Sequence, residues 1–310
     1  MIQGLFKNSS PVVKILLTLF AMVAGFAVFT LLGMLLSYMF FGTGFDSVSG
    51  NLSFDNAKNV AVLKLMQTCF SIGVFVFPPF MLAFLVSGKV GNYLGLKRSA
   101  SFSQVIMAIM LVLFSIPLVN FLVMINESIR FPESLKWIEN SFKSLENNAE
   151  KASTAFLKAP SFGQYLVNVF VIGLIPALGE ELSFRGVFQK ILHEWAKNIH
   201  VAIFISAFIF SAMHLQFYGF FARLLLGMLF GYLFYWSGSL WLPIIAHFFN
   251  NSFAVTLYYL RGDLAQKAED IGTGREMLPS VVVSIIVVSL LLYSVYKSSK
   301  ENTSGFSEAP

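Results

Sequence analysis

The sequence predicts an all-α integral membrane protein with about eight transmembrane helices and a buried polar site between helices four, five and seven. Three observations support this fold class. Hydrophobic residues make up 56% of the chain and charged residues only 12%, with a mean hydropathy of +0.74. Apolar runs recur along most of its length. Ionisable side chains interrupt three of the later runs, where a charge is costly in lipid.

The expected helices are apolar runs, most of which reach the ~20 residues that a helix needs to cross about 30 Å of hydrocarbon. The shortest are the fifth and the sixth. The eight runs are 12–40, 60–87, 103–125, 162–187, 200–217, 220–236, 239–260 and 280–296. The polar stretches 126–161 and 261–279 are expected to lie outside the cell, and the tail from Ser298 to Pro310 is expected to be disordered.

The lysine and arginine positions predict the orientation in the membrane. If the N-terminus is cytoplasmic, the basic residues of the short flanks fall on that side, as the positive-inside bias requires. They are Lys7, Lys14, Lys89, Lys97, Arg98, Lys190, Lys197, Lys297 and Lys300. Both termini of this multi-pass protein are then cytoplasmic, and we expect the cell membrane of a bacterium, its inner membrane, since no organelle signal is evident. The basic residues that give the net charge of +5 are scattered along the membrane flanks and do not form a stripe, so they do not indicate nucleic-acid binding.

The fourth run carries the most informative charges. Glu181 and Arg185 are spaced i, i+4 with the acid first, the favourable order for an ion pair on a helix. Glu180 is rotated by about 100° from Glu181 and is freer to face a cavity and act as a base. Pro176 shortly before it releases a backbone carbonyl and bends the helix, which opens room for a polar pocket.

Two later runs each present one polar stripe at the same spacing. Phe210 and His214 share a face of the fifth helix, and His247 and Asn251 share a face of the seventh. If the fourth helix continues to about residue 195, Glu180 lies ~22 Å from its cytoplasmic end, close to the ~21 Å depth of His214 and the ~12 to 18 Å of the seventh-helix pair. A single site therefore requires this longer fourth helix.

Together, the patterns Glu-Glu-x-x-x-Arg, Phe-x-x-x-His and His-x-x-x-Asn resemble the CAAX protease and bacteriocin-processing family (CPBP, or Abi), which includes the type II CAAX prenyl endopeptidases. The residues that match are Glu180, Glu181, Arg185, Phe210, His214, His247 and Asn251. The resemblance divides the chain into an N-terminal transmembrane scaffold (1–159), a CPBP-like catalytic core (160–260) and a last region of loop, span and tail (261–310).

The resemblance implies an intramembrane endopeptidase, a hydrolase acting on a membrane-associated peptide or protein in a cavity reached from the cytoplasm. According to this resemblance, Glu180 would activate the attacking water with help from His214, while His247 and Asn251 would form the oxyanion hole. The residues that order the site would be Glu181, Arg185 and Phe210. A base needs burial and a hydrogen-bonding neighbour, and amide and imidazole donors suit a tetrahedral oxyanion.

A zinc-dependent peptidase is the alternative on the same residues. Zinc would take Glu180, His214 and His247 as ligands, with water in the fourth position. The favoured mechanism requires no cofactor, and the metallopeptidase signature His-Glu-x-x-His is absent, because His193 and Glu194 are followed by Trp-Ala-Lys.

Functions other than peptide hydrolysis also stay open. A proton-coupled transporter would be expected to show duplicated halves, and none is evident. A catalytically silent immunity or scaffold protein could retain the fold, with the Glu–Arg pair as a structural strut. The oligomeric state is left open. Gly227 and Gly231 predict close helix packing, either internal or at a dimer contact.

Overall fold

The computed structural model describes residues 2–43, 53–260 and 277–300. Within these ranges the chain consists of helices and their connections, without a β-strand, so the all-α prediction is confirmed. Most of the 261–279 loop and the tail beyond Lys300 lie outside the described residues.

The first two spans are long and pack closely against each other. The elements are α1 (Pro11–Phe41) and a continuous helix made of α2 (Ala57–Ser71), the π-helical η2 (Ile72–Val76) and α3 (Phe77–Val86). At their contact, a Cβ added to Gly25 would lie 2.0 Å from the carbonyl oxygen of Gly73. Only glycine permits this approach of the two backbones.

The next segment leads to a helix outside the apolar runs. Its elements are α4 (Val90–Tyr93), α5 (Phe102–Ser128), the short η3 (Glu133–Leu135) and α6 (Lys136–Leu157). A capping box starts α5, with the Ser101 hydroxyl accepting from the Gln104 amide and the Gln104 side chain accepting from the Ser101 amide. Helix α6 is polar overall, which agrees with the polar stretch expected over 126–161.

The fourth span is one continuous helix from residue 162 to 196. It consists of α7 (Phe162–Asn168), the π-helical η4 (Val169–Leu174), α8 (Ile175–Ser183), the π-helical η5 (Phe184–Phe188) and α9 (Gln189–Ala196). It therefore reaches the length that a single site requires. One π segment precedes Glu180 and Glu181 and the other follows them, which is a placement typical of functional helices.

The remaining helices complete the bundle. They are α10 (Ile199–Met213), the short η6 (Phe217–Gly219), α11 (Phe220–Ser237), α12 (Trp241–Leu260) and α14 (Met277–Lys300). Helix α14 continues to Lys300, so Ser298 to Lys300 are helical and not part of a disordered tail as predicted, while the rest of that tail lies outside the described residues. The last turn of α14 is held by the Gln104 side chain, which lies within hydrogen-bond distance of the Ser298 and Ser299 hydroxyls.

Six helices are long and apolar enough to cross a membrane, among the residues described: 11–41, 57–86, 102–128, 162–196, 217–237 and 277–299. The other two expected spans are helical but are not among these six. Helix α10 has only 15 residues, and α12 has 20 residues but carries polar side chains such as His247 and Asn251. The multi-pass membrane class is supported, while the count of eight stays a prediction.

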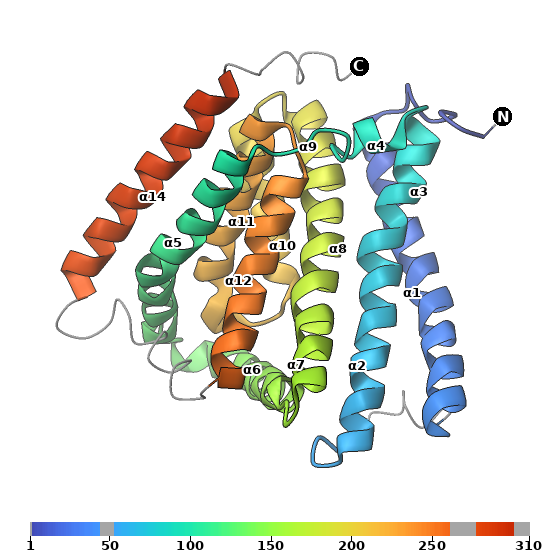
Figure 1. The fold of residues 1–310 in the computed structure, drawn as a ribbon, viewed down its shortest axis with the longest axis vertical. Coiled ribbons are helices and arrows are strands. Elements are labelled where there is room, and N and C mark those ends of the chain that lie inside the picture. The colour runs from blue at the N-terminus through green and yellow to red at the C-terminus, as the bar shows by residue number, and fades with distance from the viewer. Residues whose placement is uncertain (1, 44–52, 261–276, 301–310) are drawn as a thin grey trace.

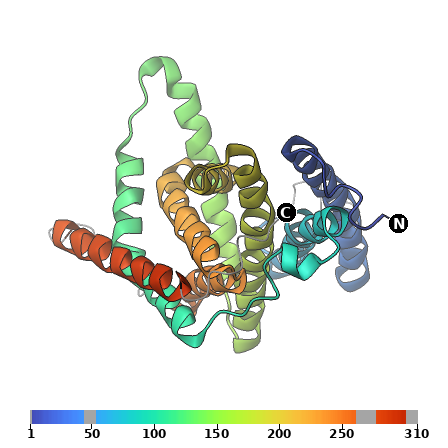
Figure 2. The same ribbon diagram turned by 90° about the horizontal axis from the view of Figure 1, so that it is seen from above.

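The helices form a central group flanked on two sides. In Figures 1 and 2, α5 and α14 lie on one side of α8, α10, α11 and α12, and the pair of α1 and α2 lies on the other. Helix α6 lies at one end of the bundle. The start of α1 and the end of α14 lie at the opposite end, which is compatible with both termini on one side of the membrane.

A loop between the flanking and central helices fixes where α12 begins. The Leu240 amide donates to the Gly95 carbonyl at 3.0 Å, and the Trp241 indole donates to the Leu96 carbonyl at 2.9 Å. Gly95 has a φ of +78°, and a Cβ there would lie 2.8 Å from the Phe234 ring. These contacts set the register of α12 and therefore the position of His247, just under two turns later.

We predict that Gly25→Val lowers the stability of the protein by about 1–3 kcal/mol, because the added side chain forces α1 away from η2. Thermal unfolding in detergent measures the effect. Ala27→Val is the matched control, since Ala27 is exposed on the same helix and gains the same side chain. Equal melting temperatures for the two variants would contradict a close glycine contact.

Candidate active site

A buried ion pair lies at the centre of the molecule. Arg185 Nη1 donates to Glu181 Oε1 at 2.7 Å, and both side chains are about 1% exposed or less. The spacing of the two residues in the sequence predicted this pair. The Arg185 guanidinium also donates through Nη2 to the Gly227 carbonyl on α11, at 2.7 Å. A buried pair is tolerable only with such additional hydrogen bonds, because both ions have lost their hydration.

His247 joins both glutamates. Its Nδ1 lies 2.9 Å from Glu181 Oε1, and its Nε2 lies 3.8 Å from Glu180 Oε2. A carboxylate oxygen only accepts, so Nδ1 carries a proton and donates to Glu181. Nε2 can then also donate only when the ring carries a second proton. The 3.8 Å separation exceeds hydrogen-bond distance and leaves Glu180 free to accept from another group.

Glu180 and Glu181 differ in their surroundings. The Glu180 side chain retains 15% of its exposure, while Glu181 is fully buried. One carboxylate oxygen of Glu181 accepts from both Arg185 and His247, and the other, Oε2, is buried without a hydrogen-bond partner in the described part of the chain. An unsatisfied buried oxygen is a place where an ordered water or a ligand donor is expected. Glu181 is therefore held by two donors, while Glu180 has no hydrogen bond to His247 and stays partly exposed.

Two phenylalanines enclose these polar groups. The Phe210 ring lies 5.0 Å from the Arg185 guanidinium carbon, 5.0 Å from the His214 ring and 6.1 Å from the His247 ring. Phe230 stacks on His247 at 5.3 Å and lies 5.6 Å from the same guanidinium carbon. Rings at this range attract a cation through their faces and exclude water from the ion pair.

His214 approaches the site from the end of α10. Its Nδ1 lies 2.9 Å from the Phe210 carbonyl, and because that oxygen only accepts, Nδ1 carries the proton. In the neutral ring Nε2 then has a free lone pair and can accept a proton from water. Among the described residues His214 makes no hydrogen bond or ion pair to Glu180, whose ionic neighbour is His247. The expected cooperation of the two residues would have to pass through a bound water.

Asn251 lies one turn beyond His247 on α12 and contacts the first π segment. Its Nδ2 donates to the Ile172 carbonyl at 3.2 Å, and its Oδ1 accepts from Asn250 at 3.2 Å. Ile172 is four residues before Pro176, which has no amide hydrogen to complete an α-helical bond. The Asn251 amide donates to the carbonyl that the proline cannot serve, and it keeps one further N–H for another acceptor.

The structure thus gathers most of the expected residues and adds some from a helix that the sequence did not implicate. Arg185 and His247 connect Glu180, Glu181 and Phe210 into one cluster, with His214 and Asn251 at its edges. The contributions missed from the sequence come from α11, namely the Phe230 ring and the Gly227 carbonyl. Phe230 is one of 35 phenylalanines, and a backbone carbonyl has no residue signature. The only feature of the sequence that pointed to α11 as a close neighbour was the spacing of Gly227 and Gly231.

The two glycines of α11 pack inside the chain. A Cβ on Gly227 would lie 2.9 Å from the Ala207 side chain of α10, and one on Gly231 would lie 2.8 Å from Ile203. The Gln189 amide donates to the Gly231 carbonyl at 3.2 Å, one turn beyond the equivalent bond from Arg185 to Gly227. Glu181, Arg185 and Gln189 therefore form one polar stripe, and α11 approaches it closely because of the glycines.

The zinc alternative was tested against the same side chains. No group of three or more His, Cys, Asp or Glu residues is placed to hold a metal ion in the part of the chain that the structure describes. The Nδ1 atoms of His214 and His247 are engaged by Phe210 and Glu181. These bonds leave both Nε2 atoms available, and an Nδ1 bond of this kind is also what a metal-bound histidine makes, so the zinc set of Glu180, His214 and His247 stays an alternative prediction.

Comparison with known proteins supports the family indicated by the motifs. Residues 162–253 match a family model described as type II CAAX prenyl endopeptidase Rce1-like, and this confirms the resemblance. The match covers a little under a third of the chain and contains all seven of the expected site residues. Comparisons with curated proteins and with solved structures found no match.

We predict that Arg185→Met destabilises the protein by about 3–5 kcal/mol, because it leaves the Glu181 carboxylate buried without its cation. The double variant Glu181→Gln with Arg185→Met should regain a substantial part of that loss. Chemical unfolding in detergent measures both. Lys136→Met is the control, since it removes one partner of an exposed i, i+3 pair with Glu133 and should have a much smaller effect. A double variant no more stable than Arg185→Met would mean that the pair is not the dominant interaction.

Proposed function

Because residues 162–253 carry an Rce1-like type II CAAX prenyl endopeptidase domain, we propose that this protein is an intramembrane endopeptidase that hydrolyses a peptide bond by glutamate-activated water. The single observation that supports the proposal most strongly is the arrangement of the two glutamates around His247. One carboxylate is bound by Arg185 and His247, and the other faces the same imidazole without a hydrogen bond. Such a pair separates a positioning role from a reactive role.

Glu180 is the general base of this proposal. It removes a proton from a water molecule whose oxygen attacks the carbonyl carbon of the scissile peptide bond. His214 accepts a hydrogen bond from that water through its unprotonated Nε2. The protonated Glu180 then delivers the proton to the leaving nitrogen as the carbon–nitrogen bond breaks, so that the base is regenerated. Burial among helices and phenylalanine rings makes each of these interactions stronger than it would be in water.

His247 and Asn251 stabilise the oxyanion of the tetrahedral intermediate. The His247 imidazolium donates from Nε2, and Asn251 donates the N–H that its bond to Ile172 leaves available. Donors of this kind contribute about 2.7–4 kcal/mol each to transition-state stabilisation. Glu181 and Arg185 keep the imidazole oriented, and Phe210 and Phe230 hold it between their rings.

The substrate class follows from the location of the site and from the family. We expect a membrane-associated peptide or protein, which reaches the site from the cytoplasmic side, with both termini of the enzyme on that side. No cofactor takes part in this mechanism. The CAAX-type, prenylated C-terminus is the substrate class that the family description names, and it is the first class to test.

We predict that Glu180→Gln lowers kcat about 10²- to 10⁴-fold, because the amide cannot take the proton from water. Asn251→Ala should lower kcat about 10²- to 10³-fold through loss of an oxyanion donor. The measurement is cleavage of fluorogenic, membrane-associated peptides, including farnesylated ones, by protein purified in detergent. Glu127→Gln is the control, since that carboxylate is exposed at the end of α5 and should leave the rate unchanged.

A chelator arm tests the zinc alternative in the same assay. Activity that resists chelation and is lost in Glu180→Gln supports the proposed mechanism. Activity that is lost on chelation and restored by zinc would replace it by a metal mechanism with the same residues as ligands. Cleavage that survives Glu180→Gln at the wild-type rate would place the chemistry elsewhere in the molecule.

A further inference from the structure

Two adjoining cavities lie at the end of the bundle where α2 and α7 begin, away from the proposed catalytic residues. The larger has a volume of about 1050 Å³ and lies between α2, the α6–α7 connection, α7 and the end of α12. The smaller has a volume of about 700 Å³ and lies between α6 and the segment before α2. Four residues line both cavities: Phe54, Asp55, Ala155 and Lys158. The two spaces therefore share a wall.

The larger cavity is lined mainly by apolar side chains. They come from α2 on one side and from the helix 162–196 on the other, and they include Val60, Leu65, Val167, Phe170 and Val171. Val167 and Phe170 are almost half exposed, so this wall continues onto the outer surface of a membrane-spanning helix. A hydrocarbon chain can therefore enter the cavity from the bilayer between α2 and α7.

One cation is buried in this apolar wall. Lys64 is 9% exposed, and its Nζ donates to Asn168 Oδ1 at 2.6 Å and lies 5.9 Å from the Phe156 ring. No carboxylate lies within ion-pair distance of it among the residues that the structure describes. A lysine inside a membrane-spanning segment without a counter-ion is costly, and such residues mark binding sites or ion pathways. Lys64 thus offers a positive charge to an anion in the cavity.

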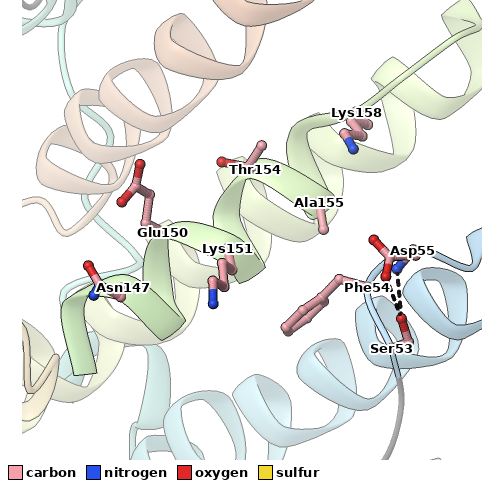
Figure 3. A pocket seen from close by; sticks show the side chains of 9 residues that line it. All are labelled: Ser53, Phe54, Asp55, Asn147, Glu150, Lys151, Thr154, Ala155 and Lys158. Atoms are coloured by element: carbon pink, nitrogen blue, oxygen red, sulfur yellow. Dashed lines mark hydrogen bonds between the residues drawn. The ribbon is translucent and has the colours of Figure 1, made fainter. Parts of the chain in front are cut away.

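The smaller cavity is polar. Figure 3 shows Lys151 and Ala155 on the side of α6 toward the segment that carries Phe54 and Asp55, and Lys158 just beyond the end of the helix also lines the cavity. The Asp55 carboxylate accepts from the Ser53 hydroxyl at 3.0 Å. With Glu150 also lining it, the chamber contains charges of both signs. It suits a polar headgroup, in contrast with the apolar space on the other side of the shared residues.

The depth of Lys64 matches that of a lipid phosphate. Lys64 is seven residues from the start of α2 and Asn168 is six from the start of α7, so both lie ~10 Å from the helix ends. Tyr258 and Tyr259 line the same cavity at the end of α12. Tyrosine prefers the level of the lipid headgroups. The cation therefore lies near the boundary between headgroups and hydrocarbon.

We propose that the paired cavities bind a membrane phospholipid, with one acyl chain between α2 and α7, the phosphate at Lys64 and Lys158, and the remaining headgroup in the chamber under α6. An apolar cavity beside a polar one, together with the charge of Lys64 that no carboxylate balances among the described residues, identifies this class of ligand. The site uses α2 and α6, which lie outside the segment that matches the family model. It is independent of the proposed peptidase chemistry and can be tested separately.

The test uses the full chain, stripped of lipid in detergent, and measures thermal unfolding during titration with phosphatidylglycerol or with diacylglycerol of the same chains. The expected result is that phosphatidylglycerol raises the melting temperature more than diacylglycerol does. Lys64→Met should weaken the apparent phosphatidylglycerol affinity about fivefold or more, the factor that corresponds to roughly 1 kcal/mol per basic residue near the surface. Lys58→Met, exposed on the same helix, is the matched control and should behave as wild type.

A second variant tests the cavity rather than the charge. Ala61→Trp fills the apolar space while keeping Lys64, and it should abolish the response to both lipids. Because each variant is compared with itself across lipids, a general loss of stability does not affect the result. Equal shifts by phosphatidylglycerol and diacylglycerol in wild type, or an unchanged difference between them in Lys64→Met, would overturn the proposal. Peptide cleavage is not part of the readout, so failure here leaves the proposed function unaffected.

Discussion

The buried carboxylate of Glu181 is the group on which the arrangement of the site depends. Outside water it is stable only with partners, and Arg185 and His247 both donate to the same one of its oxygens. The Arg185 guanidinium in turn needs the Gly227 carbonyl, so α11 must approach closely. Three separate helices are therefore joined through one ionised group, which explains why a charge so costly in a membrane is compatible with a stable fold.

The irregular backbone of the fourth helix places this group. Pro176 leaves the Ile172 carbonyl without its α-helical partner, a π segment takes up the change of register, and Asn251 donates to the carbonyl from another helix. A second π segment carries Arg185. Wider turns rotate side chains relative to a regular helix, and each extra residue alters which face they occupy. The two irregular segments thus define a short regular stretch that presents adjacent glutamates to different surroundings.

The parts of the chain outside the matched domain support it in distinct ways. Helix α1 packs on η2 through Gly25 and Gly73, and the loop around Gly95 holds the beginning of α12. Lys64 of α2 donates to Asn168 at the start of the helix that later carries the glutamates. The proposed lipid site uses that same contact. A bound phospholipid would therefore stabilise the position of α2 against the domain, at a distance from the proposed reaction.

The sequence alone determined the all-α class and most of the helices, because hydrophobic runs and i, i+4 spacing are local properties that a helix converts directly into faces. It determined the Glu181–Arg185 pair for the same reason. Only the tertiary structure decided that His247 is the neighbour of Glu180, that His214 lies at the edge, and that α11 encloses the site with Phe230. These relations depend on how helices from distant parts of the chain are turned toward one another, and residue spacing within each helix carries no information on that rotation.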